Sequence, residues 1–276
     1  MDFINILVIA QKELKDARRN RWLLLYSLVF GGLALTFALL ALSGSGVYNN
    51  IAFGRITASL INLVILIVPL MGLSLGALGI AEERERGILM YMLSQPVTRV
   101  EILLGKYFGL AFSLLGALML GFGCSGIFIA LKGGTSHTVV YIEFIGITFL
   151  LTLVSLSFGF LISILSRKTT MAIGLALFTW LFLVFFTDLG LMGTALVLKL
   201  KANELLLISL INPLQVFKLA SILILGNNLD ILGPGGTYAV RFYGNSLLPV
   251  LLTILIVLTT ISLSLSCWIL KKTKDV

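Results

Sequence analysis

The amino-acid sequence predicts an all-α integral membrane protein built as a single domain over residues 1–276. Apolar residues make up 59% of the chain and charged residues only 12%, about half the charged share of an ordinary soluble domain, and the mean hydropathy is +1.10. Several apolar runs reach the roughly 20 residues that a helix needs to cross the hydrocarbon core. These runs do not alternate with polar residues as the strands of a membrane barrel do, so we expect spanning helices.

The N-terminal residues 1–21 predict an amphipathic helix that lies in the membrane interface. Apolar residues fall on one helical face and basic residues gather toward the end of the segment, a pattern typical of interfacial helices. The segment does not resemble a signal peptide, because its basic region is long and contains acidic residues. The apolar face comprises Phe3, Ile6, Leu7, Ala10, Leu14 and Ala17.

The apolar runs predict six transmembrane helices. A seventh, within residues 203–225, would place the C-terminal lysines outside, against the bias of lysine and arginine toward the cytoplasmic side. With six spans, fourteen of the twenty lysines and arginines lie in the inside segments. We therefore expect a multi-pass protein of the inner (cytoplasmic) membrane with both termini in the cytoplasm. The predicted spans are residues 22–42, 56–81, 102–131, 141–165, 170–190 and 247–270.

Small residues at helical spacing predict close helix packing in the second span. Gly72 and Gly76 form a GxxxG pair, and Gly79 continues the row. Such a row lets two helix backbones approach closely in a membrane. The sequence leaves open whether the partner helix lies in the same chain or in a second copy. The fourth span carries a comparable stripe of Ser155, Gly159 and Ser163.

The segment of residues 82–101, between the second and third spans, predicts a short helix set crosswise to them. It contains four of the chain's twelve acidic residues. Gly87 separates the charged turn from six apolar residues, which are too few to span a bilayer. Pro96 ends that stretch because proline lacks an N–H donor. Thr98 and Glu101 then form a capping-box pattern that starts the next helix.

Residues 191–246 predict an extracytoplasmic loop with two short helices, either flat on the membrane edge or re-entrant. The helices break at Asn212-Pro213, and residues 196–225 are so apolar that, exposed, they would mark an interface. They either dock an outer protein or plug the outer mouth of the protein. We expect Leu214, Phe217 and Leu225 to face the membrane and Gln215 and Lys218 to point outward. The expected docking residues are Asn212, Pro213, Phe217 and Lys218.

The sequence argues against most other function classes. Asp188, Glu143, Glu204 and His137 show no fixed spacing for catalysis or for a metal site, and an ion-coupled carrier would need ionisable residues near mid-span. The basic residues that give a net charge of +8 lie beside spans; they indicate contact with the lipid bilayer and not with nucleic acid. No GxxxxGK[ST] phosphate loop occurs, so ATP would have to be hydrolysed by another chain.

The segment of residues 82–101 resembles the ABC-2 type transporter permeases. Residues 85–89 (ERGIL), 93–99 (LSQPVTR) and 102–106 (ILLGK) are similar to the E-x-G-T-L, L-P-V-S-R and I-L-x-G-K elements of that family. Ile88 stands where threonine is usual, and the glutamine before Pro96 is a second departure. Both the glycine break and the proline stop are kept.

Within that family the sequence is most similar to permeases of the NosY type, the membrane subunits of the ABC transporter that matures nitrous oxide reductase. Residues 10–22 (AQKELKDARRNRW) look like the opening of these permeases, and residues 211–213 (INP) look like a motif of their outer loop. The resemblance covers the whole chain in length and order of spans.

The resemblance implies a homodimer of permeases bound to two copies of a separate ATPase subunit. ATP and Mg²⁺ would be held by the ATPase, and this chain would be non-catalytic, with no cofactor and no metal. The NosY type also implies a periplasmic partner with a copper- or sulfur-handling role; the alternative is an ABC-2 exporter of a drug, a lipid-like compound or an ion. The short helix would dock in a groove of the ATPase. The ATPase-coupling residues would be Glu82, Glu83, Glu85, Gly87, Ile88, Leu89, Met92, Leu93, Pro96 and Arg99.

Overall fold

The computed structural model describes residues 2–17, 19, 21–43, 49–133, 138–187, 202–225 and 242–272, and this part of the chain contains no β-strand. The predicted all-helical fold is therefore confirmed. The long helices are α2 (Arg21–Ser43), α3 (Asn49–Glu85), α5 (Arg99–Gly133), α6 (Thr138–Leu165), α7 (Thr169–Phe185) and α12 (Leu247–Lys272). The shorter elements are α1 (Phe3–Ala17), α4 (Ile88–Leu93), α9 (Ala202–Ile211), α10 (Pro213–Ile224) and the 3-10 turn η4 (Gly244–Ser246).

Five of the predicted spans lie within long helices and the fifth span overlaps α7, with its residues 188–190 outside the described residues, but six crossings are not confirmed. Within the described residues, four helices are long and apolar enough to cross a membrane, or five if the bent pair α9–α10 counts as one span. The described apolar parts of α2 and α7, Leu24–Thr36 and Thr169–Phe185, fall short. The 17 residues of α7 cover about 25 Å at 1.5 Å per residue, less than a hydrocarbon core of about 30 Å. The six-span topology stays a prediction.

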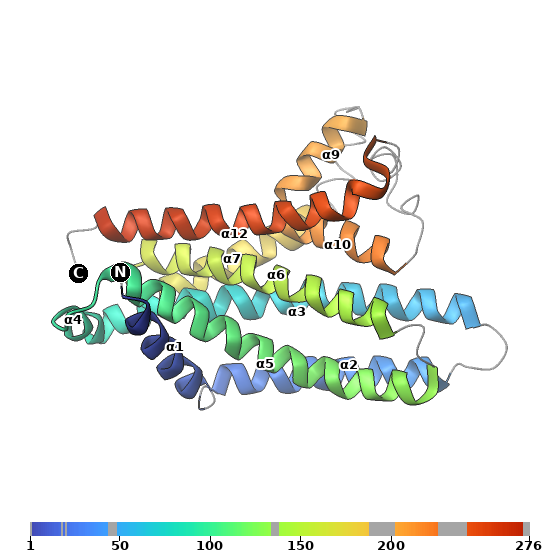
Figure 1. Ribbon diagram of the computed structural model, residues 1–276, viewed down its shortest axis with the longest axis horizontal. Helices are drawn as coiled ribbons and strands as arrows, with labels where there is room; N and C mark the ends of the chain where they lie inside the picture. Colours follow the sequence, from blue (N-terminus) through green and yellow to red (C-terminus); the bar gives the residue numbers. More distant parts are fainter. Residues whose placement is uncertain are drawn as a thin grey trace.

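The long helices lie side by side along the longest axis of the molecule (Figure 1). The start of α1, the short helix α4 and the end of α12 gather at one end, and α9 lies toward the other (Figure 1). The end that holds α4 is called the coupling end below. The predicted N-terminal helix is present as α1, and it packs on α5.

Helices α3 and α6 pack closely against each other, and this contact explains the glycine row. A Cβ atom added to Gly76 would lie 2.6 Å from the Leu156 carbonyl oxygen and 2.9 Å from the Gly159 Cα. Gly72 likewise faces Ser155, and Gly79 faces the Phe160 ring. The structure thus places all three glycines of the row against a helix of the same chain.

Ser163 reinforces this contact with hydrogen bonds. Its hydroxyl oxygen accepts hydrogen bonds from the backbone N–H groups of Ile80 and Ala81, at 3.0 and 2.8 Å. Backbone N–H groups inside a helix rarely donate to a side chain of another helix, because they normally donate to carbonyl groups of their own helix. The small residues of α3 and α6 allow this approach, so the two helices are locked together next to the coupling end.

The two outer helices, α9 and α10, break at Asn212 as predicted and are bent by 111°. The Asn212 side chain caps α10 by accepting a hydrogen bond from the Leu214 N–H, and it donates to the Leu183 carbonyl and the Thr187 hydroxyl, each at 3.0 Å. Pro213 occupies the first turn, where its missing N–H costs nothing. This motif therefore fastens α10 to the end of α7.

Three expectations for α10 are wrong because the helix lies inside the bundle. Gln215, expected to point outward, is buried. Leu214 and Phe217, expected to face the membrane, are fully buried, and the ring centroids of Phe217 and Phe144 are 6.0 Å apart. Helix α10 packs against α6 and α12, so its polar face meets protein instead of solvent. Asn212 and Pro213 are buried as well, and Lys218 alone of the four predicted docking residues is partly accessible.

Candidate functional site

The coupling end is built around the six-residue helix α4, which the sequence predicted. Gly87, the residue before α4, has φ of 74°, a left-handed backbone conformation that glycine adopts without steric cost. This residue turns the chain sharply between the end of α3 and α4. Helix α4 ends at Leu93 with Ser94 as its C-cap, two residues before Pro96, as expected for a proline that cannot continue a helix.

The predicted capping box at the start of α5 is confirmed and does more than cap. The Thr98 N–H donates to the Glu101 carboxylate at 3.0 Å, and the Glu101 N–H donates to the Thr98 hydroxyl at 3.3 Å. The same carboxylate accepts hydrogen bonds from the Asp2 N–H at 2.9 Å and the Asn5 side-chain amide at 3.2 Å. Glu101 therefore joins the start of α1 to the start of α5.

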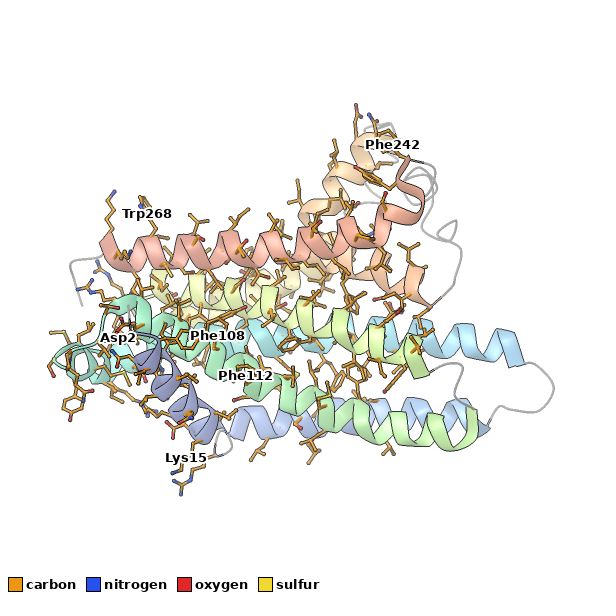
Figure 2. All side chains as sticks on the ribbon, in the orientation of Figure 1. Asp2, Lys15, Phe108, Phe112, Phe242 and Trp268 are labelled. Carbon is orange, nitrogen blue, oxygen red and sulfur yellow. The ribbon has the colours of Figure 1, made fainter. Side chains whose placement is uncertain are left out.

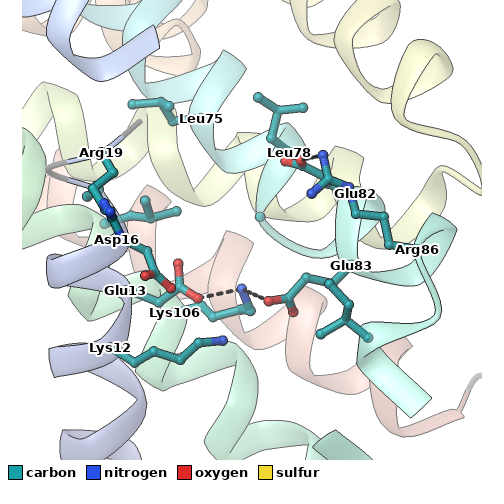
Figure 3. Close-up of a pocket in the computed structure, with 14 residues that line it drawn as sticks. Lys12, Glu13, Asp16, Arg19, Leu75, Leu78, Glu82, Glu83, Arg86 and Lys106 are labelled. Carbon is teal, nitrogen blue, oxygen red and sulfur yellow. Dashed lines mark hydrogen bonds and ion pairs between the residues drawn. The ribbon is translucent and has the colours of Figure 1, made fainter. Parts of the chain in front are cut away.

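A buried lysine binds three helices together one turn further along α5. The Lys106 ammonium lies 2.7 Å from a Glu13 carboxylate oxygen of α1 and 2.8 Å from a Glu83 carboxylate oxygen of α3 (Figure 3). The Lys106 side chain is only 3% exposed, and those of Glu13 and Glu83 are 12% and 14% exposed. A buried ammonium needs such partners, because an unpaired buried charge costs several kcal/mol.

Glycines in α5 bring α1 close enough to form this ion-pair triad. A Cβ atom on Gly105 would lie 2.7 Å from the Ile9 Cβ, and one on Gly109 would lie 2.5 Å from the Glu13 Cβ. Glu13 thus packs over Gly109 and reaches Lys106 from there. The residues Glu13, Lys106 and Glu83 are called the triad below.

Three further charged side chains tie the remaining helices to the coupling end. The Glu85 carboxylate accepts a hydrogen bond of 2.7 Å from the Thr169 N–H at the start of α7. Arg84 donates to the carbonyls of Ile164 and Ser166 at the end of α6, at 3.1 and 2.9 Å. These contacts satisfy backbone groups that helix ends leave without partners. Arg99 donates to the Leu270 carbonyl near the end of α12 at 3.2 Å.

The sequence-predicted coupling residues therefore separate into those that contact other parts of this chain and those that remain accessible to a partner. Glu83, Glu85 and Arg99 hold helices of this chain together, and Glu82 pairs with Arg86 at 2.7 Å along the chain. Leu89 is 3% exposed and packs into the core, so it anchors α4 and cannot contact a partner in this conformation. Ile88 remains accessible, and Met92 and Leu93 are partly so.

Sequence reasoning missed the two most exposed large side chains of α4. Met90 is 58% exposed and Tyr91 is 70% exposed. With Leu89 buried, the helix turns these neighbouring residues away from the bundle. The sequence could not show which side chains of α4 face the bundle, because a helix of six residues is too short to display a clear helical periodicity.

The coupling end uses its charged side chains to join elements of this chain to one another. Within the described residues, no group of three or more His, Cys, Asp or Glu side chains could hold a metal ion. Its acidic groups instead hold ammonium, guanidinium or backbone N–H partners from other elements. Asp188 and His137 lie outside the described residues.

The fold defines a polytopic helical membrane protein, and the comparisons with known proteins give its family. The chain belongs to the ABC-2 transporter family: a family model described as "ABC-2 family transporter protein" matches residues 7–275. The predicted family resemblance is confirmed. The chain is thus an ABC-2 permease subunit of an ABC transporter, a class that implies an ATPase partner and dimeric assembly.

Two curated relatives place the chain more closely. It is 37% identical over 221 residues to the "probable ABC transporter permease protein NosY" of Stutzerimonas stutzeri, covering 78% of this chain and 80% of the relative. It is 30% identical over 234 residues to the protein of the same name from Pseudomonas aeruginosa, covering 83% of this chain and 84% of the relative.

Proposed function

We propose that this chain is the membrane subunit of an ABC transporter that serves the copper- or sulfur-site maturation of nitrous oxide reductase. The NosY name of both relatives supports this role. Two copies of the chain assemble with two ATPase subunits, which bind ATP and Mg²⁺. The observation that carries the coupling part of the proposal is the exposed apolar pair Met90 and Tyr91, held out from the bundle by the buried Leu89.

Helix α4 receives the motion of the ATPase and passes it to the spans. Leu89 fixes α4 in the core, and the Gly87 turn joins it to α3. The triad then links α3 to α5 and α1, and Glu85 links α3 to α7. Packed helices move as rigid bodies because interiors resist deformation. A push on α4 therefore tilts several spans together.

An outer protein, if the complex has one, docks on α9 and not on α10. Phe217 and Asn212 are buried and cannot serve as contacts. Leu207 and Ile211, one turn apart on α9, are 62% and 73% exposed. Among the described residues, this exposed apolar pair beside the bend at Asn212 is a surface on which a periplasmic partner docks.

Substituting Met90→Asp and Tyr91→Asp together should release the ATPase from the permease. Two carboxylates would be desolvated in an apolar groove, and the loss of central anchor residues typically weakens an interface by about 2 kcal/mol or more, roughly 30-fold in affinity. The measurement is co-purification of the ATPase with the permease in detergent, together with ATP hydrolysis by the complex.

The matched control replaces Phe3 and Ile4 by aspartate, since both are 74% exposed on α1 at the same end of the molecule. The control should keep the ATPase bound. Loss of the ATPase from the α1 variant, with full retention by the α4 variant, would show that α1 is the docking element.

A further inference from the structure

A pocket of about 390 Å³ lies between α1, α3 and α5 beside the triad. Its volume falls within the range of roughly 300–1,000 Å³ typical of small-ligand sites. One wall is formed by Lys12, Asp16 and Arg19 of the N-terminal segment, and the opposite wall by Glu82 and Arg86 at the end of α3 (Figure 3). Lys106, held by its two glutamates, lies at the base between these walls (Figure 3).

The pocket carries as many acidic as basic side chains, four of each. Lys106 is already neutralised by Glu13 and Glu83, and the second carboxylate oxygen of Glu83 is buried without a hydrogen-bond partner among the described residues. An excess of negative charge therefore lies at the base. Lys12 and Arg19 supply positive charge at the wall formed by the N-terminal segment. A pocket with separate charges of both signs is complementary to a zwitterion.

The pocket also has an apolar side that continues into the spans. Leu75 and Leu78 of α3 and Leu110 of α5 line this side, and these helices are candidate membrane spans. The remaining lining residues are Ala17, Gly79 and Ile88. Arg19 lies two residues before the start of α2. The charged walls are thus at the level where the chain enters the bilayer, the level of lipid headgroups.

We propose that this pocket binds the headgroup of a zwitterionic phospholipid with a primary ammonium, phosphatidylethanolamine being the representative. The phosphate contacts Lys12 and Arg19, the ammonium donates a hydrogen bond to Asp16 and lies against the negatively charged base formed by Glu13 and Glu83, and the first part of an acyl chain lies along Leu78. Charge-assisted hydrogen bonds to carboxylates require N–H donors, which a choline headgroup lacks. A bound lipid fills the space between α1 and α3 and supports the triad from outside. All phospholipids could contact the apolar side, so the headgroup decides the preference.

Native mass spectrometry of the purified full chain tests this site directly. The protein is equilibrated with mixed vesicles of phosphatidylethanolamine, phosphatidylcholine and phosphatidylglycerol, and the retained lipids are counted. We expect about tenfold preference for phosphatidylethanolamine over phosphatidylcholine, the factor that about 1.4 kcal/mol gives. The variant Asp16→Asn with Arg19→Gln, which removes one charge of each sign, should abolish the preference. Lys15→Gln, on α1 outside the pocket lining, should keep it.

Other outcomes would contradict the lipid site or assign the pocket to another ligand. Equal retention of the ethanolamine and choline lipids by the unaltered chain, or an unchanged preference in the double variant, would overturn the proposal. Competition by soluble phosphoethanolamine at low concentration would show that the free headgroup, and not the lipid, is the ligand. Loss of the lipid on adding the ATPase subunit would assign the pocket to that protein and also contradict the lipid site.

Discussion

The variant Lys106→Met is expected to lose most of its folded population. Removing the ammonium leaves Glu13 and Glu83, which are 12% and 14% exposed, as two adjacent buried carboxylates. Breaking a buried ion pair by removing one partner costs about 3–5 kcal/mol, a large share of the stability of most proteins. The measurement is the free energy of unfolding from a denaturant titration in detergent micelles.

A triple variant distinguishes the cost of unpaired charge from the cost of lost side-chain packing. Replacing all three members of the triad together, Glu13→Gln, Lys106→Met and Glu83→Gln, removes the unpaired charges and should recover most of the lost stability. Lys15→Met, which removes an exposed lysine of α1 outside the pocket (Figure 2), should leave the unfolding free energy almost unchanged. If Lys106→Met unfolds no more easily than Lys15→Met, the triad does not hold the three helices together.

The variant Gly76→Leu is expected to separate α3 from α6. Even a single Cβ atom at this position would lie 2.6 Å from the Leu156 carbonyl oxygen and 2.9 Å from the Gly159 Cα. Both neighbours are backbone atoms and cannot turn aside as a side chain could. Overpacking costs about 1–3 kcal/mol and occasionally more, and we expect a loss of at least about 3 kcal/mol here. Parting the helices would also break the hydrogen bonds to Ser163.

Gly116→Leu provides the matched control, because a Cβ atom there meets nothing within 4 Å among the described residues. This variant should be as stable as the unaltered chain or slightly more so, since glycine weakens a helix interior by about 0.5–1 kcal/mol relative to alanine. The yield of folded protein in detergent and its apparent melting temperature measure the difference in stability between Gly76→Leu and Gly116→Leu. Equal stability of the two leucine variants would contradict the close contact of α3 with α6.

Features encoded by a few neighbouring residues could be predicted from the sequence. Thr98 and Glu101 form the expected capping box, because a capping box depends only on spacing and backbone geometry. Gly87 and Pro96 mark the limits of α4 for the same reason. The long helices follow from length and hydropathy, quantities that do not depend on tertiary packing.

Contacts between distant residues could not be predicted in the same way. The triad joins Glu13 to Lys106, 93 residues apart, and no periodicity encodes such a pairing. One signal was present: Lys106 lies inside a predicted span, where an ionisable residue normally has a partner. The burial of Phe217 depends on how α10 packs against α6, and helix patterns alone do not define that partner.

The membrane also limits what the sequence shows about which helix faces meet protein and which meet lipid. In a soluble protein an apolar face indicates the core, but here lipid and protein are equally apolar environments. The sequence therefore did not show that the glycine row of α3 meets α6 of the same chain. That choice depends on side-chain packing that forms only in the folded bundle.

Photo-crosslinking from α4 tests the central claim, that this helix docks on the ATPase, most directly. A photoreactive phenylalanine in place of Tyr91, which is 70% exposed, is irradiated in membranes that contain the assembled transporter, and the crosslinked protein is identified by mass spectrometry. Our account predicts a strong crosslink to the ATPase from position 91 and none from the buried position 89. A crosslink to the ATPase from Phe3 on α1, with none from position 91, would contradict it.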